Sequence, residues 1–230
     1  MADSFENLHQ QIISCRLCPR LVEHRETIAR EKRAAFRDWT YWGKPITGFG
    51  DPDARLLIIG LAPAAHGGNR TGRIFTGDSS GDFLMRALHE SGFANQPTSR
   101  SRDDGLRLSD AYIVAVARCA PPDNKPLPAE ILNCRPFLLG EIALLARVQA
   151  VLGLGKIALD GYVDALRTSR PELKRPKFGH GAEFQLGEGL PRLFLSYHPS
   201  RQNTQTGRLT PEMLVSVLQR VRAFLDRQEK

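Results

Sequence analysis

The sequence predicts an α/β fold, a three-layer α/β/α sandwich with a mostly parallel central sheet. Short apolar runs alternate with helical patterns along the chain, which is the order expected of strands and their covering helices. The runs ARLLIIG (54–60) and AYIVAVA (111–117) are almost continuously apolar, as in strands that are buried on both faces. Because glycine-rich or polar loops follow these strands, we expect the functional site beyond their carboxyl ends.

The N-terminal quarter of the chain is predicted to begin as helix and to continue without regular structure. The helical pattern extends to about Arg37, because apolar side chains such as Leu21 and Ile28 recur at helical spacing among charged residues. Prolines and glycines then mark residues 38–54 as an irregular segment, whose aromatic residues form a core plug. The first strand, 54–60, follows this segment and ends in a glycine turn.

The rest of the chain alternates helices and strands. A helix is predicted near 81–91. Ser79 and Asp82, at its N-terminal end, have the spacing of a capping box. The later elements are predicted as a strand at 111–117, a helix at 128–148, a strand at 149–153, a helix at about 156–168, two short strands within 182–197 and a closing helix from about 211 to 227. This order supplies helices for both faces of the sheet.

Length and charge narrow the class of protein. We expect one domain, 1–230, because nothing resembling a linker divides the chain. The net charge of +7 favours a polyanionic partner. No apolar run is long enough to span a bilayer, and the N-terminus MADSFENLHQ lacks the pattern of a signal peptide. We therefore expect a monomeric, cytoplasmic protein that makes no membrane contact.

The four cysteines form the most distinctive pattern of the chain: Cys15, Cys18, Cys119 and Cys134. The first two make a C-x2-C pair, whose thiolates can converge on one centre. Four thiolates are a full ligand set for a tetrahedral zinc ion or for a cubane iron–sulfur cluster, and the spacing does not distinguish the two. Two disulfides or four unrelated buried thiols are the alternatives, and a reducing cytoplasm disfavours the disulfides.

The glycine-rich loop after the first strand, GLAPAAHGGNRTGRIFTGD (60–78), carries the first candidate residues. Its glycines allow a close approach of the backbone, and its amides can bind anions. The spacing matches neither the dinucleotide nor the triphosphate glycine motif. Phe75 is either a core residue or a stacking platform for a base. Asp78 is either a carboxylate at a helix N-terminus or a group that positions water.

Two further loops follow the later strands. RCAPPDNKP (118–126) places Asn124 close to Cys119. YHPSRQN (197–203) places His198 at the carboxyl end of a strand, next to Ser200 and Asn203. A lone histidine is usually structural, but a position at this end of a strand favours a functional role.

Together, these three loop motifs and the four-cysteine frame resemble the uracil-DNA glycosylase superfamily, specifically its type b, or family 5, branch. The resemblance extends from Cys15 to the final helix. It implies the sandwich fold and a [4Fe–4S] cluster on the four cysteines, which ties the N-terminal helices to the domain. It also implies a DNA-repair activity: after base flipping, the N-glycosidic bond of uracil, and of other deaminated bases such as hypoxanthine, is hydrolysed to leave an abasic site.

The resemblance implies a role for each candidate residue. His198 stabilises the departing base, and Asp78, or else Asn124, positions the water. Phe75 stacks on the flipped base. The other contacts to the base are assigned to Gly60, Ala62, Ala65 and Asn203, with the DNA backbone as the alternative partner of Asn203. The contacts to the DNA backbone are assigned to Ser200, Arg70, Arg73 and Arg201.

The chain departs from better-known branches of this superfamily at three positions. Their acidic residues would fall at Leu61 or Ala62, and the Asn with which one branch reads uracil would fall at Ala115. We therefore expect weaker activation of water and a broader range of bases. Two alternatives remain from the residues alone: a non-catalytic iron–sulfur or zinc protein that binds nucleic acid, and a hydrolase of free nucleosides.

Overall fold

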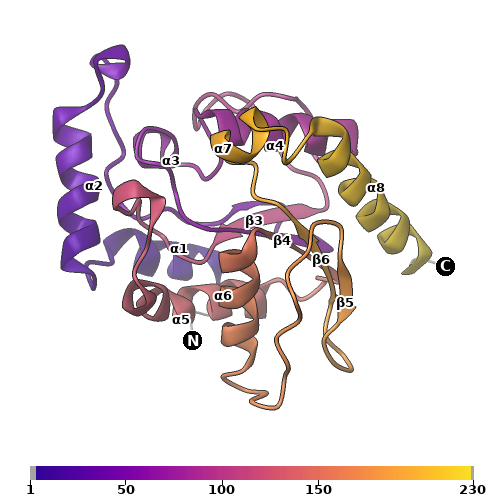
Figure 1. Ribbon diagram of the computed structural model, residues 1–230. Coiled ribbons are helices and arrows are strands. Elements are labelled where there is room, and N and C mark those ends of the chain that lie inside the picture. The colour runs from indigo at the N-terminus through magenta and orange to yellow at the C-terminus, as the bar shows by residue number, and fades with distance from the viewer. Residues whose placement is uncertain (1–3, 229–230) are drawn as a thin grey trace.

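A six-stranded sheet forms the centre of the computed structural model, which describes residues 4–228 (Figure 1). Its strands are β1 (Phe49–Gly50), β2 (Leu56–Gly60), β3 (Ala111–Ala115), β4 (Ala150–Leu154), β5 (Glu183–Gln185) and β6 (Arg192–Ser196). They lie in the order β1-β3-β2-β4-β6-β5. The four central strands run parallel, whereas the edge strands β1 and β5 pair antiparallel with their neighbours. The prediction of a mostly parallel sheet is confirmed.

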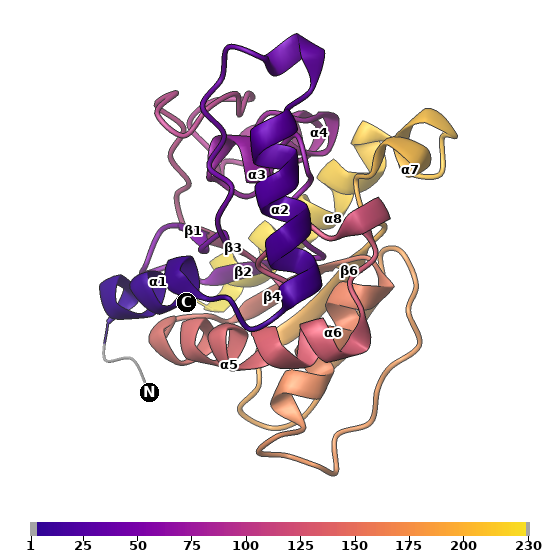
Figure 2. The same cartoon turned by 90° about the vertical axis from the view of Figure 1, so that its left-hand side faces the viewer.

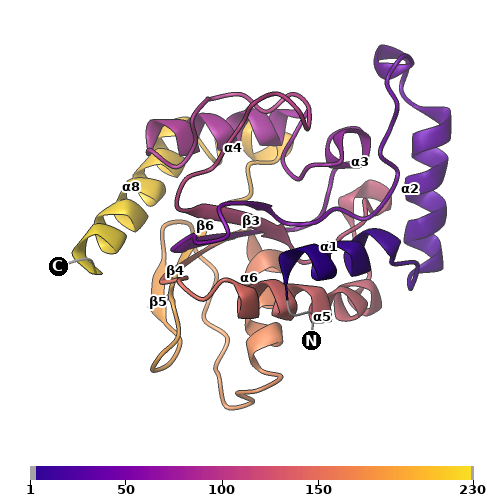
Figure 3. The same ribbon diagram turned by 180° about the vertical axis from the view of Figure 1, so that it is seen from behind.

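Helices cover both faces of the sheet, as Figures 1 and 3 show from opposite sides. One layer consists of α4 (Ser79–Glu90) and α8 (Pro211–Gln228), and the other of α1 (Phe5–Ser14), α5 (Pro128–Leu144) and α6 (Lys156–Leu166). The remaining helical elements are α2 (Pro19–Glu31), α3 (Gly68–Thr71), α7 (Arg201–Gln205) and the 3-10 turns η1 (Ala34–Phe36) and η2 (Pro122–Asn124). The α/β/α sandwich is therefore confirmed.

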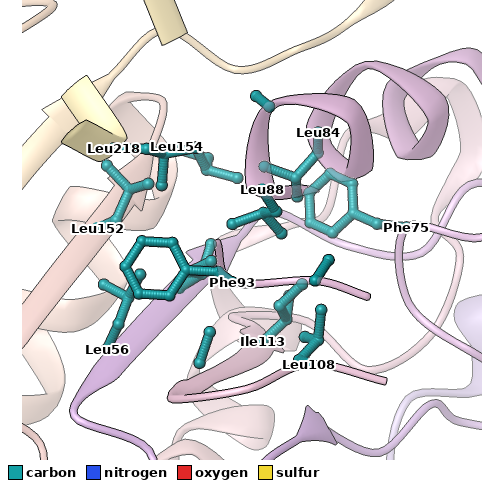
Figure 4. Close-up of a cluster of buried hydrophobic side chains, with 14 of the residues drawn as sticks. Leu56, Phe75, Leu84, Leu88, Phe93, Leu108, Ile113, Leu152, Leu154 and Leu218 are labelled. Carbon is teal, nitrogen blue, oxygen red and sulfur yellow. The ribbon is translucent and has the colours of Figure 1, made fainter. Parts of the chain in front are cut away.

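The sheet is buried on both faces because successive side chains of each central strand point to opposite layers. Ile58 and Ile113 belong to the cluster that faces α4 and α8, where the ring of Phe75 lies near Leu84 (Figure 4). Ile59 belongs to the second cluster, which faces α5 and α6. The three isoleucines are fully buried. Burial on both sides explains why the strands read as continuous apolar runs.

The N-terminal helical stretch is interrupted at the C-x2-C pair. α1 ends at Ser14 and α2 begins at Pro19, so both cysteines of the pair lie in the turn between the helices. The pattern to Arg37 had not indicated this break. Proline at the first position of α2 explains it, because proline has no N–H for the preceding turn and its ring disfavours helix in the residue before it. The edge strand β1 and the short helices α3 and α7 also went unpredicted.

The N-terminus of α4 differs from the predicted capping box. Asp78 is the N-cap residue: its Oδ1 accepts a hydrogen bond of 2.9 Å from the Gly81 N–H. Ser79 is the first residue inside the helix, so the pairing of Ser79 with Asp82 as a capping box is wrong. A carboxylate at this position satisfies a free N–H and interacts favourably with the helix dipole.

The topology places a crevice at one end of the sheet. The connection that leaves β2 passes through α4 on one face, and the connection that leaves β4 passes through α6 on the other face. Because these two connections go to opposite faces of the sheet, they leave an opening at the carboxyl ends of β2 and β4. α2 stands beside α3 at this end (Figure 2). Among residues 4–228, no helix has the length and apolar character needed to cross a membrane.

Candidate active site

A cleft of about 590 Å³ opens at the carboxyl ends of the central strands. Its walls come from the loop after β2, from the loop after β3 and from the segment after β6, and Arg33 and Phe36 close one side. Eight of the predicted site residues line it: Ala62, Ala65, Phe75, Asp78, Asn124, His198, Ser200 and Arg201. The expectation that three separate loops form one site is therefore met. Four predicted residues do not line the cleft: Gly60, Arg70, Arg73 and Asn203.

Phe75 forms an apolar wall of the cleft. Its ring is 5.9 Å from that of His198, centroid to centroid, and the two planes are inclined by 32°. Its backbone is left-handed, with φ of +48°, which costs free energy for a residue with a large side chain. The ring packs on Gly60: a Cβ atom there would lie 2.8 Å from Phe75 Cε2. Gly60 thus acts by leaving room for the ring.

His198 is held in place through its own backbone. The Asn203 side-chain amide donates to the His198 carbonyl oxygen at 2.8 Å, and Ser200 Oγ accepts from the Asn203 N–H at 3.3 Å. Burial lowers the pKa of His198 to about 4, so its imidazole is neutral at neutral pH. A neutral imidazole has one N–H donor and one acceptor nitrogen. Asn203 therefore fixes the backbone of His198 and does not line the cleft.

Asp78 combines a structural contact with a position on the cleft. One carboxylate oxygen caps α4, and the other, Oδ2, lies against the backbone of Gly67: a Cβ atom on Gly67 would fall 1.8 Å from it. Burial raises the pKa of Asp78, and the backbone N–H groups of Gly81 and Ser80 oppose that rise. A carboxylate so placed can accept a hydrogen bond from a water in the cleft.

Asn124 lies at the mouth of the cleft. The side chain is exposed, and the residue is left-handed, with φ of +55°, as is Asp123 before it, with φ of +53°. Two successive left-handed residues outside glycine are uncommon, although Asp and Asn are among the residues that tolerate this region best. The turn η2 therefore brings the amide of Asn124 to the opening without burying it.

Arg70 and Arg73 do not have the role predicted for them. Both are buried, at 3% and 5% exposure, and both bind groups of the protein itself. Arg70 donates to the carbonyl oxygens of His66 and Gly77, each at 2.7 Å. Its guanidinium stacks on two aromatic rings, those of Phe36 at 3.9 Å and Trp39 at 4.1 Å.

Arg73 forms an ion pair of 2.7 Å with Asp104 and hydrogen bonds with Thr76 and Ser99. Arg70 thus holds together residues that line the cleft, whereas Arg73 ties the glycine-rich loop to the segment that contains Ser99 and Asp104. Both guanidinium groups are not available to phosphates, and the predicted backbone contacts are corrected accordingly. Arg201, by contrast, is exposed at the edge of the cleft.

Arg33, Phe36 and His66 are among the cleft residues that were not predicted. His66 Nδ1 lies 3.1 Å from the hydroxyl of Tyr41. The position of His66 inside the glycine-rich loop was a signal that sequence reasoning could have used. Arg33 and Phe36 carry no such signal, because only the fold returns the segment after α2 to the cleft.

The four cysteines line one small apolar cavity between the α1–α2 turn, the loop after β3, and α5. All four are free thiols in the structure, so neither disulfide of that alternative forms. Burial raises the pKa of Cys119 and raises that of Cys134 to about 12. Among residues 4–228, no group of three or more His, Cys, Asp or Glu side chains is arranged to hold a metal ion.

Two buried arginines line the same cavity. Arg25 donates from Nη1 to Cys119 Sγ at 2.9 Å, and Arg118 pairs with the buried carboxylate of Glu141. Three of their nitrogen atoms have no hydrogen-bond partner among the described residues: Arg25 Nε, Arg118 Nε and Arg118 Nη1. Buried cationic donors that lack a partner are costly. The chemistry around the four sulfurs therefore fits an anionic group.

Comparison with a family model adds a match over most of the chain. The model described as "Uracil DNA glycosylase superfamily" matches residues 47–222. This span contains the whole sheet from β1 to β6, together with the cleft residues that follow β2, β3 and β6.

Curated proteins match over nearly the full length of the chain. A "Type-5 uracil-DNA glycosylase" of Mycobacterium tuberculosis is 51% identical over 215 residues, which are 93% of this chain and 79% of that protein. The protein of the same name from Thermus thermophilus is 51% identical over 211 residues, 91% of this chain and 93% of its own length. The one from Pyrobaculum aerophilum is 42% identical over 219 residues, 95% and 92% of the two chains.

Proposed function

The chain belongs to the uracil DNA glycosylase superfamily, and from that membership we propose that it is a DNA-repair enzyme that hydrolyses the N-glycosidic bond of uracil in DNA. The observation that carries the proposal is the single cleft that joins Phe75, Asp78 and His198 at the carboxyl ends of the strands. Two segments that are far apart in the sequence supply these side chains: the loop after β2 and the segment after β6. Their combination of an apolar ring, a carboxylate and a neutral imidazole suits removal of a base.

The target base must leave the DNA helix before it can enter the cleft, which costs a few kcal/mol. The face of Phe75 offers stacking, with a free energy of about 1–3 kcal/mol for each base. Stacking does not depend on the hydrogen-bonding groups along the edge of the base, so it does not distinguish one base from another. Ala62 lines the cleft without a polar side chain, and Ala115, at the end of β3, stands where a related branch has the Asn that reads uracil. We therefore expect weak rejection of other deaminated bases and include hypoxanthine among the substrates.

The reaction breaks the bond between C1′ of the sugar and the base nitrogen. The base departs with the electron pair of that bond, and the sugar becomes cationic in the transition state. His198, which is neutral, donates its N–H to the departing anion, where one such donor is worth about 3–4 kcal/mol. A water adds its oxygen to C1′ and loses a proton, the base gains a proton, and an abasic site remains.

The water is positioned by a polar side chain that lines the cleft. Asp78 is the first candidate, because one of its oxygens is committed to the α4 cap and therefore fixes the direction of the other. Asn124 is the second candidate, at the mouth. Neither Leu61 nor Ala62 can accept a hydrogen bond through its side chain, so activation of water is weak and stabilisation of the leaving base supplies much of the rate.

DNA is held mainly by charge. The net charge of +7 attracts the phosphates, and Arg201 and Ser200 lie at the edge of the cleft, where the backbone would pass. Since binding of phosphate releases counterions, affinity should fall steeply as salt concentration rises.

We further propose that Cys15, Cys18, Cys119 and Cys134 hold a [4Fe–4S] cluster. The cavity that the four share and the unpaired donors of Arg25 and Arg118 support an anionic occupant. When bound, the cluster would supply a cross-link between distant parts of the chain. Arg20 of α2 and Glu130 of α5 already make a two-point ion pair, at 2.8 and 2.7 Å, across the same boundary.

Release of free uracil tests the proposed function. The protein is incubated with a uracil-containing oligonucleotide, with the same strand carrying thymine instead, and with free deoxyuridine. The proposal requires uracil from the first substrate and none from the second. Binding of DNA without release would favour a non-catalytic nucleic-acid-binding protein, and release from free deoxyuridine alone would favour a nucleoside hydrolase.

A further inference from the structure

A chain of hydrogen bonds ends at the histidine that sequence reasoning missed. The backbone N–H of Arg33 donates to the Tyr41 hydroxyl at 3.4 Å, and that hydroxyl lies 3.1 Å from His66 Nδ1. The rings of Tyr41 and His66 meet edge to face, with centroids 6.1 Å apart. Tyr41 is buried, at 8% exposure, whereas His66 lines the cleft.

This chain of bonds assigns the proton on the His66 ring. Among the described contacts, His66 Nδ1 is the one acceptor that the buried Tyr41 hydroxyl can reach, so the hydroxyl donates to it. Nδ1 is then the acceptor nitrogen, and the ring proton sits on Nε2. Nε2 is the polar atom of the ring that is left for a ligand in the cleft.

Two arginines are among the groups that act electrostatically on His66. Burial lowers the pKa of His66, and Arg33, Arg70 and His24 lower it further. Arg70 is bound to the protein, yet its charge still raises the potential at this wall. Arg33 is exposed and lines the cleft with His66. A neutral N–H donor beside an exposed guanidinium, in a positive field, suits an anion that reaches the rim of the cleft from solvent.

We propose that His66 and Arg33 form a phosphate subsite for the DNA linkage next to the flipped nucleotide, and that Tyr41 is a positioning residue that keeps the His66 proton on Nε2. The proposal rests on the function proposed above, because it names how the same cleft holds its substrate. The subsite also gives the glycine-rich loop a contact to phosphate, which the buried Arg70 and Arg73 cannot make.

Binding to an abasic analogue tests the subsite without chemistry. The probe is an oligonucleotide with a tetrahydrofuran residue in place of the deoxyuridine, in which the linkages on either side are replaced, one at a time, by a neutral methylphosphonate. For the unaltered protein, one linkage should weaken binding when neutralised. His66→Phe should weaken binding to the unmodified probe by about 10- to 100-fold, as expected for one hydrogen bond to a charged group. Neutralising the critical linkage should then have a smaller effect on that variant, because only Arg33 is left to bind the phosphate.

Salt dependence separates the two partners. Arg33→Ala should lower the slope of log affinity against log salt by about 0.7–0.9, the value for one phosphate contact. His66→Phe should leave the slope unchanged, because a neutral donor releases no counterion. Arg37→Ala removes the same charge from an exposed residue that does not line the cleft, and it should change affinity and slope much less.

The role of Tyr41 has its own readout. Long-range ¹H–¹⁵N spectra of the unaltered protein should show His66 protonated on Nε2, and Tyr41→Phe should shift the population toward Nδ1 while binding weakens. His66→Gln, which keeps an N–H donor, should recover part of the affinity that His66→Phe loses.

Three results would overturn the proposal: an Nδ1 proton in the unaltered protein, methylphosphonate effects that remain in full in His66→Phe, or a loss with uracil DNA that vanishes with the abasic probe. The last result would mean that His66 contacts the base. Because every arm measures binding or spectra, failure of uracil release by the unaltered protein would contradict the proposed function separately.

Discussion

The rings of Phe75 and His198 lie 5.9 Å apart in the cleft, although one follows β2 and the other follows β6. The pair brings an apolar ring face and a neutral imidazole to the same point. Phe75 adopts a left-handed backbone to reach it, and His198 is held there by the amide of Asn203. The sheet topology, which gathers the carboxyl ends of its strands, makes this meeting possible.

Gly60→Ala should displace the ring of Phe75, because the new Cβ would lie 2.8 Å from it. We expect a slower single-turnover reaction on uracil and hypoxanthine alike. Phe75→Ala should weaken binding of both bases by about 1–3 kcal/mol. Gly179→Ala is the matched control, because its nearest neighbour would be 3.8 Å from the added Cβ. If the two bases respond very differently to Gly60→Ala, Phe75 does not act by stacking alone.

His198→Ala should slow excision of uracil by roughly 10²–10³ in single-turnover rate, as expected for loss of one principal donor to a developing anion. His89→Ala, on the exposed side of α4 and away from the cleft, should react at the unaltered rate. A near-normal rate for His198→Ala would show that the leaving base is stabilised by other groups.

The stability of the protein should fall in mild acid because of His198. Burial lowers the folded-state pKa to about 4 from 6.5, so the unfolded chain binds this proton at a higher pH than the folded chain does. The free energy of unfolding should therefore decrease as the pH falls from 6.5 towards 4, and this contribution should be constant above 6.5. Urea denaturation at several pH values should show a smaller decrease in His198→Asn. An equal decrease in both proteins would place the titration elsewhere.

Substitutions at Asp78 should separate its two tasks. Asp78→Asn keeps an N-cap side chain, so the free energy of unfolding should change little, whereas Asp78→Ala should lose about 1 kcal/mol. Both should slow hypoxanthine excision more than uracil excision, because the poorer leaving base needs a better-positioned water. Single-turnover kinetics on both bases and urea denaturation measure the two effects. Equal slowing of both bases would mean that activation of water limits the uracil reaction as well.

Protein purified without oxygen should be brown and should contain iron and sulfide in nearly equal amounts. Serine in place of Cys134 should lower the iron content and destabilise the contact between α2 and α5. Stoichiometric zinc without sulfide would contradict the iron–sulfur assignment. It would leave standing only the proposal that the four cysteines bind one metal centre.

The sheet and its two helical layers could be predicted because each strand and helix has its own apolar pattern within a short segment of sequence. Ile58 and Ile59 belong to runs that must be buried on both sides, and strand alternation decides which layer each faces. The presence of Asp78 and His198 in one cleft could also be predicted, since both follow parallel strands whose carboxyl ends share one edge.

Contacts between segments that are far apart in the sequence could not be predicted. A positive charge in a loop suggests a phosphate contact, but it does not reveal that Arg73 has Asp104 as a partner or that Arg70 stacks on Trp39. Arg33 was missed for the same reason, because it reaches the cleft only when the segment after α2 folds back. Asn203 lies in α7, five residues after His198, and donates to its carbonyl oxygen, which a motif alone does not show.

The most direct test of the account is a mass balance on one uracil-containing oligonucleotide. The account predicts one free uracil for every strand converted and an uncut strand in which the base has been replaced by a hydroxyl, both measured by mass spectrometry. The thymine strand should stay unchanged. Tight binding of the uracil strand with no uracil released, or cleavage of the strand without release of the base, would contradict it.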